Sequence, residues 1–421
     1  MENIIIKNDE KFKSIYISFN FTFKIKKEEY AKNSIMASVL SKASKKYNSV
    51  KEIEDYLNYL YGSLFEVECN KFGDLYNIEF KLNVVNKKFL PNNEDVLIKV
   101  LEFLNEIIYN PLLVDNNNNI MFTDKIFLRE KQNTIQKINK RKDDKLRYGI
   151  AKTEELLFEN ENYGMYIYGD EESVKKVENI DIYNAYVNMI NNSNVTVILT
   201  GNLSGYENII EDIKKIFKDN IRSNVTYEYL RENINNKVED SYREVVEKID
   251  TKQSVIGLGL KIDNVSKDEI YILNMYSSIL GGTPSSKLFQ NVREKESLAY
   301  TTRTRYYRFK DAIILYAGIE EANFNKAKEV MIEQINDMKK GNITDIEFTS
   351  AKQSLISDIK EYVDSKILVS KQNLINLLED NEDNIETIIR KIESVTIEDV
   401  IKISKRINLK LVYLLGGETD E

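Results

Sequence analysis

The most informative segment of this chain is residues 281–318, GGTPSSKLFQNVREKESLAYTTRTRYYRFKDAIILYAG. The segment predicts a loop, an amphipathic helix that ends in a charged run, and two strands joined by a basic turn. Two of its polar side chains, Arg293 and Tyr300, carry chemistry. Arginine is a permanent cation with a forked set of donors, and tyrosine is a donor that stays protonated at neutral pH. Together they could hold a peptide carbonyl.

The same two residues also have a purely structural interpretation. Arg293 would be a surface charge on a helix near Glu294 and Glu296, and Tyr300 an aromatic residue packed on a sheet. The chemistry of the side chains alone favours this second interpretation.

The composition bounds the class of protein. A chain of 421 residues is long enough for two domains with sizeable cores. Charged residues make up 30% of it with both signs mixed, and the net charge is -8, so we expect no nucleic-acid partner. The first residues, MENIIIKNDEKF, contain too short an apolar run for a signal peptide, and no run is long enough to span a bilayer. We therefore expect a cytoplasmic protein with no membrane partner.

The chain contains no histidine. This removes the imidazole general base, the Ser-His-Asp and Cys-His arrangements and the commonest zinc ligand. A catalyst would have to use carboxylates, lysine or tyrosine. The single cysteine, Cys69, excludes an intrachain disulfide and lies in an alternating strand pattern, where a structural buried thiol is expected. We expect no metal and no cofactor.

The first half alternates predicted strands and helices. Ser49 and Glu52 have the spacing of a capping box, and a hairpin is expected to turn near Gly73. The expected elements are strands at 3–7 and 13–24, helices at 27–45, 50–61 and 94–109, one long charged helix at 123–159, a strand at 195–203 and a helix to about 218.

The second half repeats this order. A strand at 254–262 and a helix at 267–280 precede the opening segment, and helices at 323–340 and 344–368, shorter helices and a final strand follow it. The helix and hairpin of each half correspond at an offset of about 235 residues, which indicates an internal duplication. We predict an α+β fold of two duplicated halves, each a mostly antiparallel sheet with helices packed on one face. The predicted domains are an N-terminal half at 1–220, a linker at 221–245 and a C-terminal half at 246–421.

Other candidate sites are weak. GLGL at 257–260 lacks the third glycine of a dinucleotide fingerprint and predicts a strand against which another backbone packs closely. Gly281-Gly282 is interpreted as a helix C-cap. The acidic pairs Asp143-Asp144 and Glu154-Glu155 lie in charged helical surroundings and are interpreted as solvated faces.

The run SSKLFQNVREKESLAY resembles the second half of insulinase/pitrilysin-type peptidases, the inverzincin family, in its branch similar to mitochondrial processing peptidase. The duplicated halves, the REK at 129–131 and the VILTGNL strand extend the resemblance over nearly the whole chain. It is similar to small bacterial members of the family that lack catalysis. Under this resemblance Arg293 and Tyr300 match the family's substrate-binding pair, and their functional interpretation becomes the favoured one.

The resemblance also locates a lost zinc site. The family carries H-x-x-E-H on the first helix of its first half. Aligned from Ala43-Ser44, where the family has Gly-Thr, the three motif positions fall on Ser34, Ala37 and Ser38, and the third ligand falls on Lys137. None of these residues can serve as the family's ligands or base.

A retained pair beside a lost zinc site implies a protein that is not a peptidase on its own. The expected function is the substrate-binding subunit of a peptidase formed with a zinc-carrying homologue, with a peptide as substrate. The alternatives are a non-proteolytic peptide- or protein-binding scaffold, a self-associating homodimeric pseudoenzyme, and an independent enzyme that uses carboxylates or tyrosine.

Overall fold

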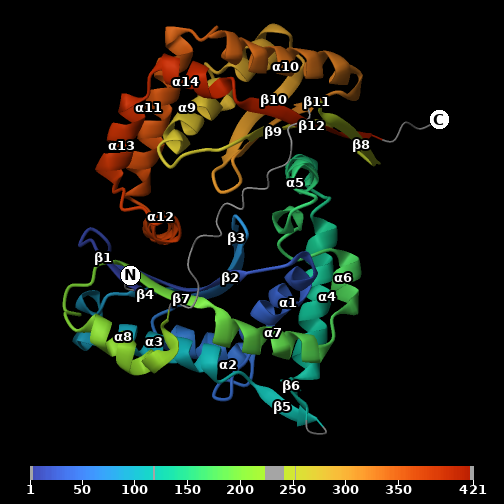
Figure 1. Ribbon diagram of the computed structural model, residues 1–421. Helices are drawn as coiled ribbons and strands as arrows, with labels where there is room; N and C mark the ends of the chain where they lie inside the picture. Colours follow the sequence, from blue (N-terminus) through green and yellow to red (C-terminus); the bar gives the residue numbers. More distant parts are fainter. Residues whose placement is uncertain (1–2, 117–118, 223–240, 252, 418–421) are drawn as a thin grey trace. The chain divides into compact units, whose positions relative to one another are not determined.

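The computed structural model describes residues 3–116, 119–222, 241–251 and 253–417. The chain forms two compact units, each built around one five-stranded sheet (Figure 1). Unit 1 comprises Met1–Asn139, Met165–Leu230 and Tyr362–Glu382, and unit 2 comprises Lys140–Gly164, Arg231–Glu361 and Asp383–Glu421.

The sheet of unit 1 has the strand order β1-β7-β2-β4-β3. β1 is parallel to β7, and the other neighbours are antiparallel. The predicted hairpin turn near Gly73 joins β3 to β4, and Gly73 has a φ of 57° there. The strands are β1 (Ile4–Asn8), β2 (Ser14–Lys24), β3 (Leu64–Phe72), β4 (Leu75–Val85) and β7 (Asn194–Gly201), with a separate hairpin of β5 (Leu113–Asn116) and β6 (Asn119–Phe122).

Helices bury the apolar face of this sheet. One core contains alternate residues of β2, namely Ile15, Ile17, Phe19 and Phe21, and apolar residues from each of the helices named at the end of this paragraph. At the start of α2 the Ser49 hydroxyl accepts the Glu52 N–H at 3.3 Å, as the capping-box spacing predicted. The helices are α1 (Tyr30–Leu40), α2 (Val50–Tyr59), α3 (Val96–Tyr109), α4 (Asp124–Lys140), α6 (Glu171–Lys176), α7 (Asn179–Asn192) and α8 (Ile209–Phe217).

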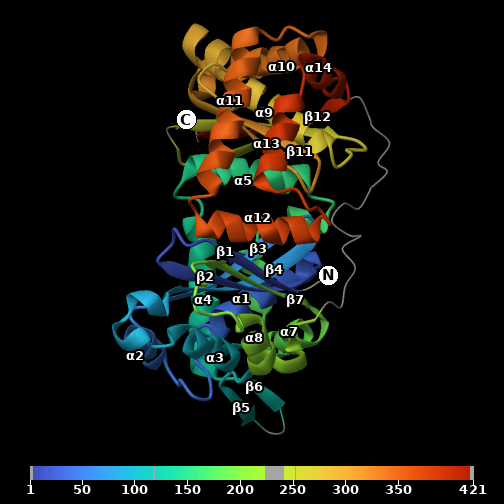
Figure 2. The ribbon, with the colours of Figure 1, turned by 90° about the vertical axis from the view of Figure 1, so that its left-hand side faces the viewer.

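The polar face of the same sheet is buried as well. Ser18 donates to Glu79 at 2.6 Å, Asn20 donates to Ser18 at 2.8 Å, and Asn77 donates to Asn20 at 3.0 Å. Helix α12 (Lys366–Leu378), shown in red-orange in Figure 2, packs against β7 and β2 of this sheet. Each of these hydrogen bonds avoids the cost of burying a polar group without a partner, which is about 1–3 kcal/mol.

The sheet of unit 2 repeats the topology of the first. Its order is β8-β12-β9-β11-β10, with β8 parallel to β12 and the other neighbours antiparallel. β3 and β10 begin at residues 64 and 299, an offset of 235. The duplicated α+β fold is thereby confirmed. The strands are β8 (Arg243–Ile249), β9 (Ser254–Ile262), β10 (Ala299–Tyr307), β11 (Ala312–Ile319) and β12 (Ile407–Gly417).

The core of unit 2 lies between this sheet and its helices. Ile256, Leu258 and Leu260 of β9 share it with Leu273 and Leu280 of α9. The helices of this core are α9 (Glu269–Gly281), the π-helix η7 (Phe289–Lys295), α10 (Phe324–Lys340), α11 (Asp345–Tyr362), α13 (Ile385–Ser394) and α14 (Ile397–Ser404). The Gly282 N–H donates to Ser278 O at 2.8 Å, so the glycine pair does end α9 as expected.

Two predicted long helices are each broken, which corrects the sequence-based expectation. The charged helix expected at 123–159 divides into α4 and α5 (Lys145–Leu157), and Asp144 caps α5 by accepting the Arg147 N–H at 3.0 Å. The helix expected at 344–368 ends with α11, and Ser365 caps α12. The acidic pair at 143–144 is therefore a helix boundary rather than a solvated helix face.

Because of these breaks, each half of the sequence contributes one helix to the unit formed mainly by the other half. Residues 140–164, with α5, belong to unit 2, whereas residues 362–382, with α12, belong to unit 1. The compact units therefore differ at these two segments from the predicted domains 1–220 and 246–421. Of the predicted linker 221–245, residues 223–240 lie outside the described residues, and its end includes the start of β8.

Helix α5 packs closely on β9 through small residues. A Cβ added to Gly257 would lie 2.1 Å from Thr153 Oγ1, and one added to Gly259 would lie 2.8 Å from Leu157 Cδ1. On the helix, a Cβ at Gly149 would meet the side chain of Val255 at 2.8 Å. GLGL is a strand with close packing against it, as predicted, but the atoms that meet its glycines are side-chain atoms of a helix rather than another backbone.

We expect Gly257→Ala to destabilise unit 2 by about 1–3 kcal/mol, because the buried, branched Thr153 cannot rotate away from the new methyl group. Gly259→Ala is the matched control, since its methyl group meets the movable end of Leu157. Calorimetry should show a lower Tm for the first variant, by about 2–4 °C per kcal/mol, and a smaller change for the second. Equal shifts for the two variants would contradict this packing.

Candidate functional site

Arg293 lies on the exposed side of η7 in unit 2. Its guanidinium carbon lies 4.7 Å from the ring centroid of Phe289, and its Nε lies 3.6 Å from Glu294 Oε1. Val292, the residue before Arg293, is fully buried and fixes the helix to the core. The helix ends with the Leu298 N–H donating to Val292 O at 2.9 Å. Arg293 therefore presents its charge to solvent from a helix whose other face is anchored.

Tyr300 lies at the start of edge strand β10, where the pairing with β11 is irregular between Ala299 and Thr301. Its side chain is 59% exposed. The phenol donates to Glu320 Oε1 at 2.6 Å, and this carboxylate raises the pKa of Tyr300. The hydroxyl therefore remains a donor at neutral pH.

The structure places these two residues on neighbouring elements, since η7 packs against β10. Arg293 contacts Phe289 and Glu294, and Tyr300 bonds Glu320, so the two side chains do not bond each other directly. Arg293 presents N–H donors at the surface of unit 2, whereas the single O–H of Tyr300 is donated to Glu320 and would have to leave that carboxylate to bind a ligand. This arrangement can bind a carbonyl or carboxylate group, whose oxygen would accept from either donor.

The three motif positions predicted for the lost zinc site lie on α1 in unit 1. Ser34 and Ala37 are buried, and the Ser34 hydroxyl donates to Ala31 O at 2.9 Å. The Ser38 hydroxyl donates to Glu130 Oε2 at 2.7 Å. Their spacing does place them along one side of the helix, but each is occupied in packing or in a hydrogen bond.

Lys137, the fourth predicted position, is an exposed residue of α4. Its ammonium lies 5.3 Å from the ring centroid of Tyr168. Tyr168 O in turn lies 3.5 Å from Ser34 Oγ, so one loop reaches both predicted positions. Gly169 allows this approach, because its φ is 76° and an added Cβ would lie 3.1 Å from Ala31.

Cys69, on β3, does not have the properties of a nucleophile. Burial raises the pKa of its thiol to about 12, which keeps it protonated. The described residues contain no group of three or more acidic, cysteine or histidine side chains that could hold a metal ion. None of the helices in the same part of the chain has the length and apolar character needed to cross a bilayer.

The sequence-based reasoning missed the role of Glu130, although the REK at 129–131 supported the resemblance. Glu130 is only 3% exposed and also accepts from Arg129 Nε at 3.1 Å and from Asn133 at 3.2 Å. Its bond to Ser38 ties α4 to α1 beside the lost motif. The available signal was a glutamate at helical spacing from buried Phe127 and Thr134.

The acidic pair at 154–155 has a structural role. Glu155 lies near Lys152 at 3.5 Å and forms an ion pair with Arg141, across the break between α4 and α5. Its side chain is 18% exposed. The pair is therefore not a set of free catalytic carboxylates.

We expect Ser38→Ala to destabilise unit 1 by about 1–3 kcal/mol, because it removes a hydrogen bond to a buried carboxylate. Ser41→Ala is the matched control on the same helix end, since that hydroxyl bonds only the local carbonyl of Ser38 at 2.7 Å. Urea unfolding followed by circular dichroism measures both. Equal losses for the two variants would show that the bond to Glu130 has no special weight.

Comparison with known proteins bears on the whole chain. Residues 176–355 match the family model described as Peptidase M16 inactive domain. The chain is 28% identical over 415 residues to the probable inactive metalloprotease YmfF of Bacillus subtilis, covering 98% of this chain and 95% of that protein. It is 25% identical over 254 residues to the uncharacterized zinc protease YmxG of the same organism, covering 59% of each.

A solved structure extends the comparison to the fold. The crystal structure of a conserved protein from Enterococcus faecalis V583 superposes with a TM-score of 0.88 at 23% identity, covering 100% of this chain and 98% of that one. The predicted resemblance is thereby confirmed: residues 176–355 match a Peptidase M16 inactive domain, and the chain is similar along nearly its whole length to a protein described as a probable inactive metalloprotease.

Proposed function

We propose that this chain is a zinc-free, peptide-binding subunit that acts in the cytoplasm with a zinc-carrying homologue. The observation that carries the proposal is the contrast between two sets of positions. Arg293 and Tyr300 keep exposed donors, whereas Ser34, Ala37 and Ser38 have side chains that cannot bind zinc.

The retained donors suit peptide binding rather than cleavage. Arg293 offers a permanent charge with several N–H groups, and Tyr300 offers a phenol whose raised pKa keeps its proton. Both can donate to the carbonyl oxygens of an extended peptide. Hydrolysis also needs a nucleophilic water, which the family activates with zinc and a glutamate. The proposed homologous partner would supply both of these.

The relatives include a protein described as inactive and a protein described as a zinc protease, which are the two kinds of chain that this proposal pairs. The relative that matches this chain along almost its whole length is described as a probable inactive metalloprotease. The second relative, which matches over 59% of this chain, is described as an uncharacterized zinc protease. A division of labour between such chains would place the donors on one subunit and the metal on the other.

A second candidate function is a scaffold that binds peptides or proteins without any proteolysis, as a monomer or a homodimer. It is favoured by the full-length similarity to a protein described as inactive. The two functions differ in what a zinc-carrying homologue adds: cleavage in the first, and nothing in the second. An independent enzyme is not proposed, because the carboxylate pairs considered for it cap or tie helices.

The mixture of this chain with a zinc-carrying homologue should cleave fluorescein-labelled casein faster than the homologue alone, and chelation with EDTA should abolish the cleavage. Arg293→Ala should remove most of the gain. Arg390→Ala is the matched control, because that exposed arginine of α13 contacts only local groups such as Thr387. No gain on mixing, together with casein binding by this chain alone, would favour the scaffold function.

Arg293→Ala should also weaken the binding of labelled casein to this chain alone by about tenfold or more, the size expected for losing a hydrogen bond from a charged donor. Fluorescence anisotropy in the presence of EDTA measures this Kd without metal. The Arg390→Ala variant should bind as the native chain does. An unchanged Kd in the Arg293→Ala variant would contradict a role for this residue in binding.

Tyr300→Phe should weaken casein binding by about two- to tenfold, since the phenylalanine lacks the donor hydroxyl. Glu320→Ala is the informative counterpart, because Glu320 accepts the bond from Tyr300. Freeing the hydroxyl should leave the affinity equal or higher. A loss of affinity in Glu320→Ala as large as in Tyr300→Phe would mean that the Tyr300–Glu320 bond is only structural.

A further inference from the structure

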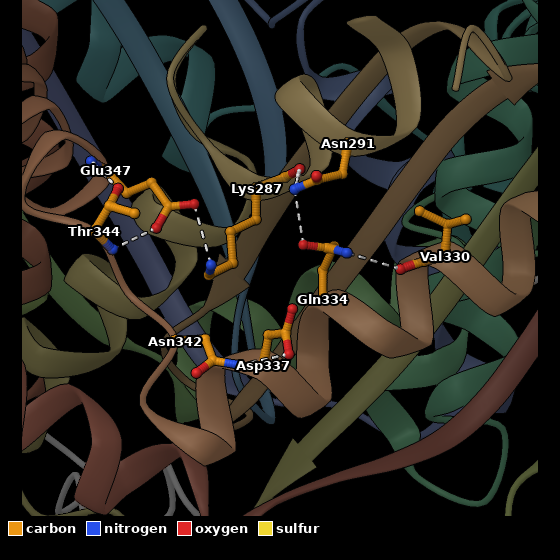
Figure 3. Close-up of polar contacts among 8 residues, drawn as sticks. All are labelled: Lys287, Asn291, Val330, Gln334, Asp337, Asn342, Thr344 and Glu347. Carbon is orange, nitrogen blue, oxygen red and sulfur yellow. Dashed lines mark hydrogen bonds and ion pairs between the residues drawn. The ribbon is translucent and has the colours of Figure 1, made fainter. Parts of the chain in front are cut away.

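A buried ion pair lies behind the helix that carries Arg293. Lys287, a helical residue two positions before the start of η7, places its Nζ 3.1 Å from Oε1 of Glu347 on α11. The two side chains are 6% and 12% exposed. Figure 3 shows the two side chains pointing toward each other between their elements.

Glu347 is itself fixed in place by the start of its helix. Its other oxygen, Oε2, accepts the Thr344 N–H at 2.8 Å, and the Glu347 N–H donates to Thr344 Oγ1 at 3.2 Å. This is a reciprocal capping box. One carboxylate therefore both closes the N-terminus of α11 and receives the ammonium of Lys287, so the lysine is tied to a rigid point.

A second tie joins the same helix to α10. Asn291 of η7 donates to Gln334 at 2.9 Å and to Lys287 O at 3.0 Å, and Gln334 donates to Val330 O at 3.4 Å (Figure 3). The side chain of Asn291 thus satisfies a carbonyl at the entry of η7. Two polar ties, one to α10 and one to α11, act on one short helix.

Helix η7 needs such ties because its geometry is unfavourable. A π-helix is rare, occurs in short pieces and is frequent at functional sites. The guanidinium of Arg293 contacts Phe289 and Glu294, which both belong to η7. The place of this guanidinium therefore follows the backbone of η7, which the pair Lys287–Glu347 holds from behind.

Stability alone does not account for a buried ion pair. Removing two charges from water costs several kcal/mol per ion by order of magnitude, and apolar replacements of such pairs are often neutral or stabilising. A fixed geometry is what the pair adds. We propose that Lys287 and Glu347 are positioning residues that hold η7, and hence Arg293, in its peptide-binding place; the peptide arm of this inference rests on the proposed function.

The test uses the full chain and separates positioning from stability. Lys287→Met/Glu347→Gln removes both charges and keeps an acceptor for the Thr344 N–H, whereas Glu347→Gln alone leaves a buried unpaired ammonium. Lys287→Arg keeps the pair and is the conservative control. We expect the double variant to melt closer to the native chain than Glu347→Gln does.

Hydrogen exchange followed by mass spectrometry reports on η7 without any peptide. In the double variant, amides of residues 289–295 should exchange about tenfold faster, while those of β9 and β11 are unchanged and Lys287→Arg remains close to the native chain. Native exchange at 289–295 in the double variant would overturn the proposal. This result stands whether or not the chain binds peptides.

Binding of labelled casein tests the link to Arg293. The double variant should weaken binding by about five- to tenfold in the native background and have no further effect in Arg293→Ala, because both changes act through one guanidinium. An equal loss in both backgrounds would overturn positioning through Arg293. If Arg293→Ala binds casein like the native chain, the proposed function fails, and the exchange result alone decides whether the pair holds η7.

Discussion

The close packing of α5 on β9 is the contact on which the arrangement of the chain depends. Gly257 and Gly259 leave no side chain at two positions of the strand face that α5 covers, so Thr153 and Leu157 of the helix can approach the strand directly there. This contact draws residues 140–164 into unit 2 although they follow unit 1 in the sequence. The break after α4, with Asp144 as the new cap, is what permits it.

The reverse exchange completes unit 1. Helix α12 packs on β7 and β2, and Lys366 donates to Asn83 at 2.9 Å on the polar face of the sheet. The polar residues of that face then satisfy one another. Each sheet is therefore covered on both faces, with one helix of its second face taken from the other half of the sequence.

The two predicted sites show how a family fold survives a change in one site. On α1 the motif positions hold small residues, which are buried or bonded to Tyr168 and Glu130. A zinc site contributes folding energy of its own, so its loss requires other contacts, and these bonds are such contacts. Around η7, by contrast, the side chains that face solvent remain donors. Under the proposed function, the part that binds persists where the part that reacts has gone.

Much of the fold could be predicted from sequence, because its signals are local. Alternation in β2, the capping serine at Ser49 and the repeat offset of 235 all follow from period or spacing. The exchanged helices could not be predicted, since a run of charged residues such as 123–159 has helical character on both sides of its break. The choice of sheet depends on distant glycines.

The candidate site was predictable only in part. Arg293 and Tyr300 could be named from the motif at residues 285–300. The positions of the lost zinc site could be named by alignment with the family's H-x-x-E-H motif. The pair Lys287–Glu347 could not, because its members are 60 residues apart and an isolated lysine before a helix predicts a solvated charge. Nor does the sequence indicate that residues 289–295 form a π-helix, which depends on tertiary packing.

Under the proposed function, this chain binds an extended peptide at Arg293 and Tyr300 without zinc. Hydrogen exchange of the native chain in EDTA, with and without saturating casein, tests it most directly. We expect casein to protect the amides of η7 and the start of β10, residues 289–301, and to leave α1 unchanged. Protection confined to α1, or none in residues 289–301 while casein is bound, would contradict it.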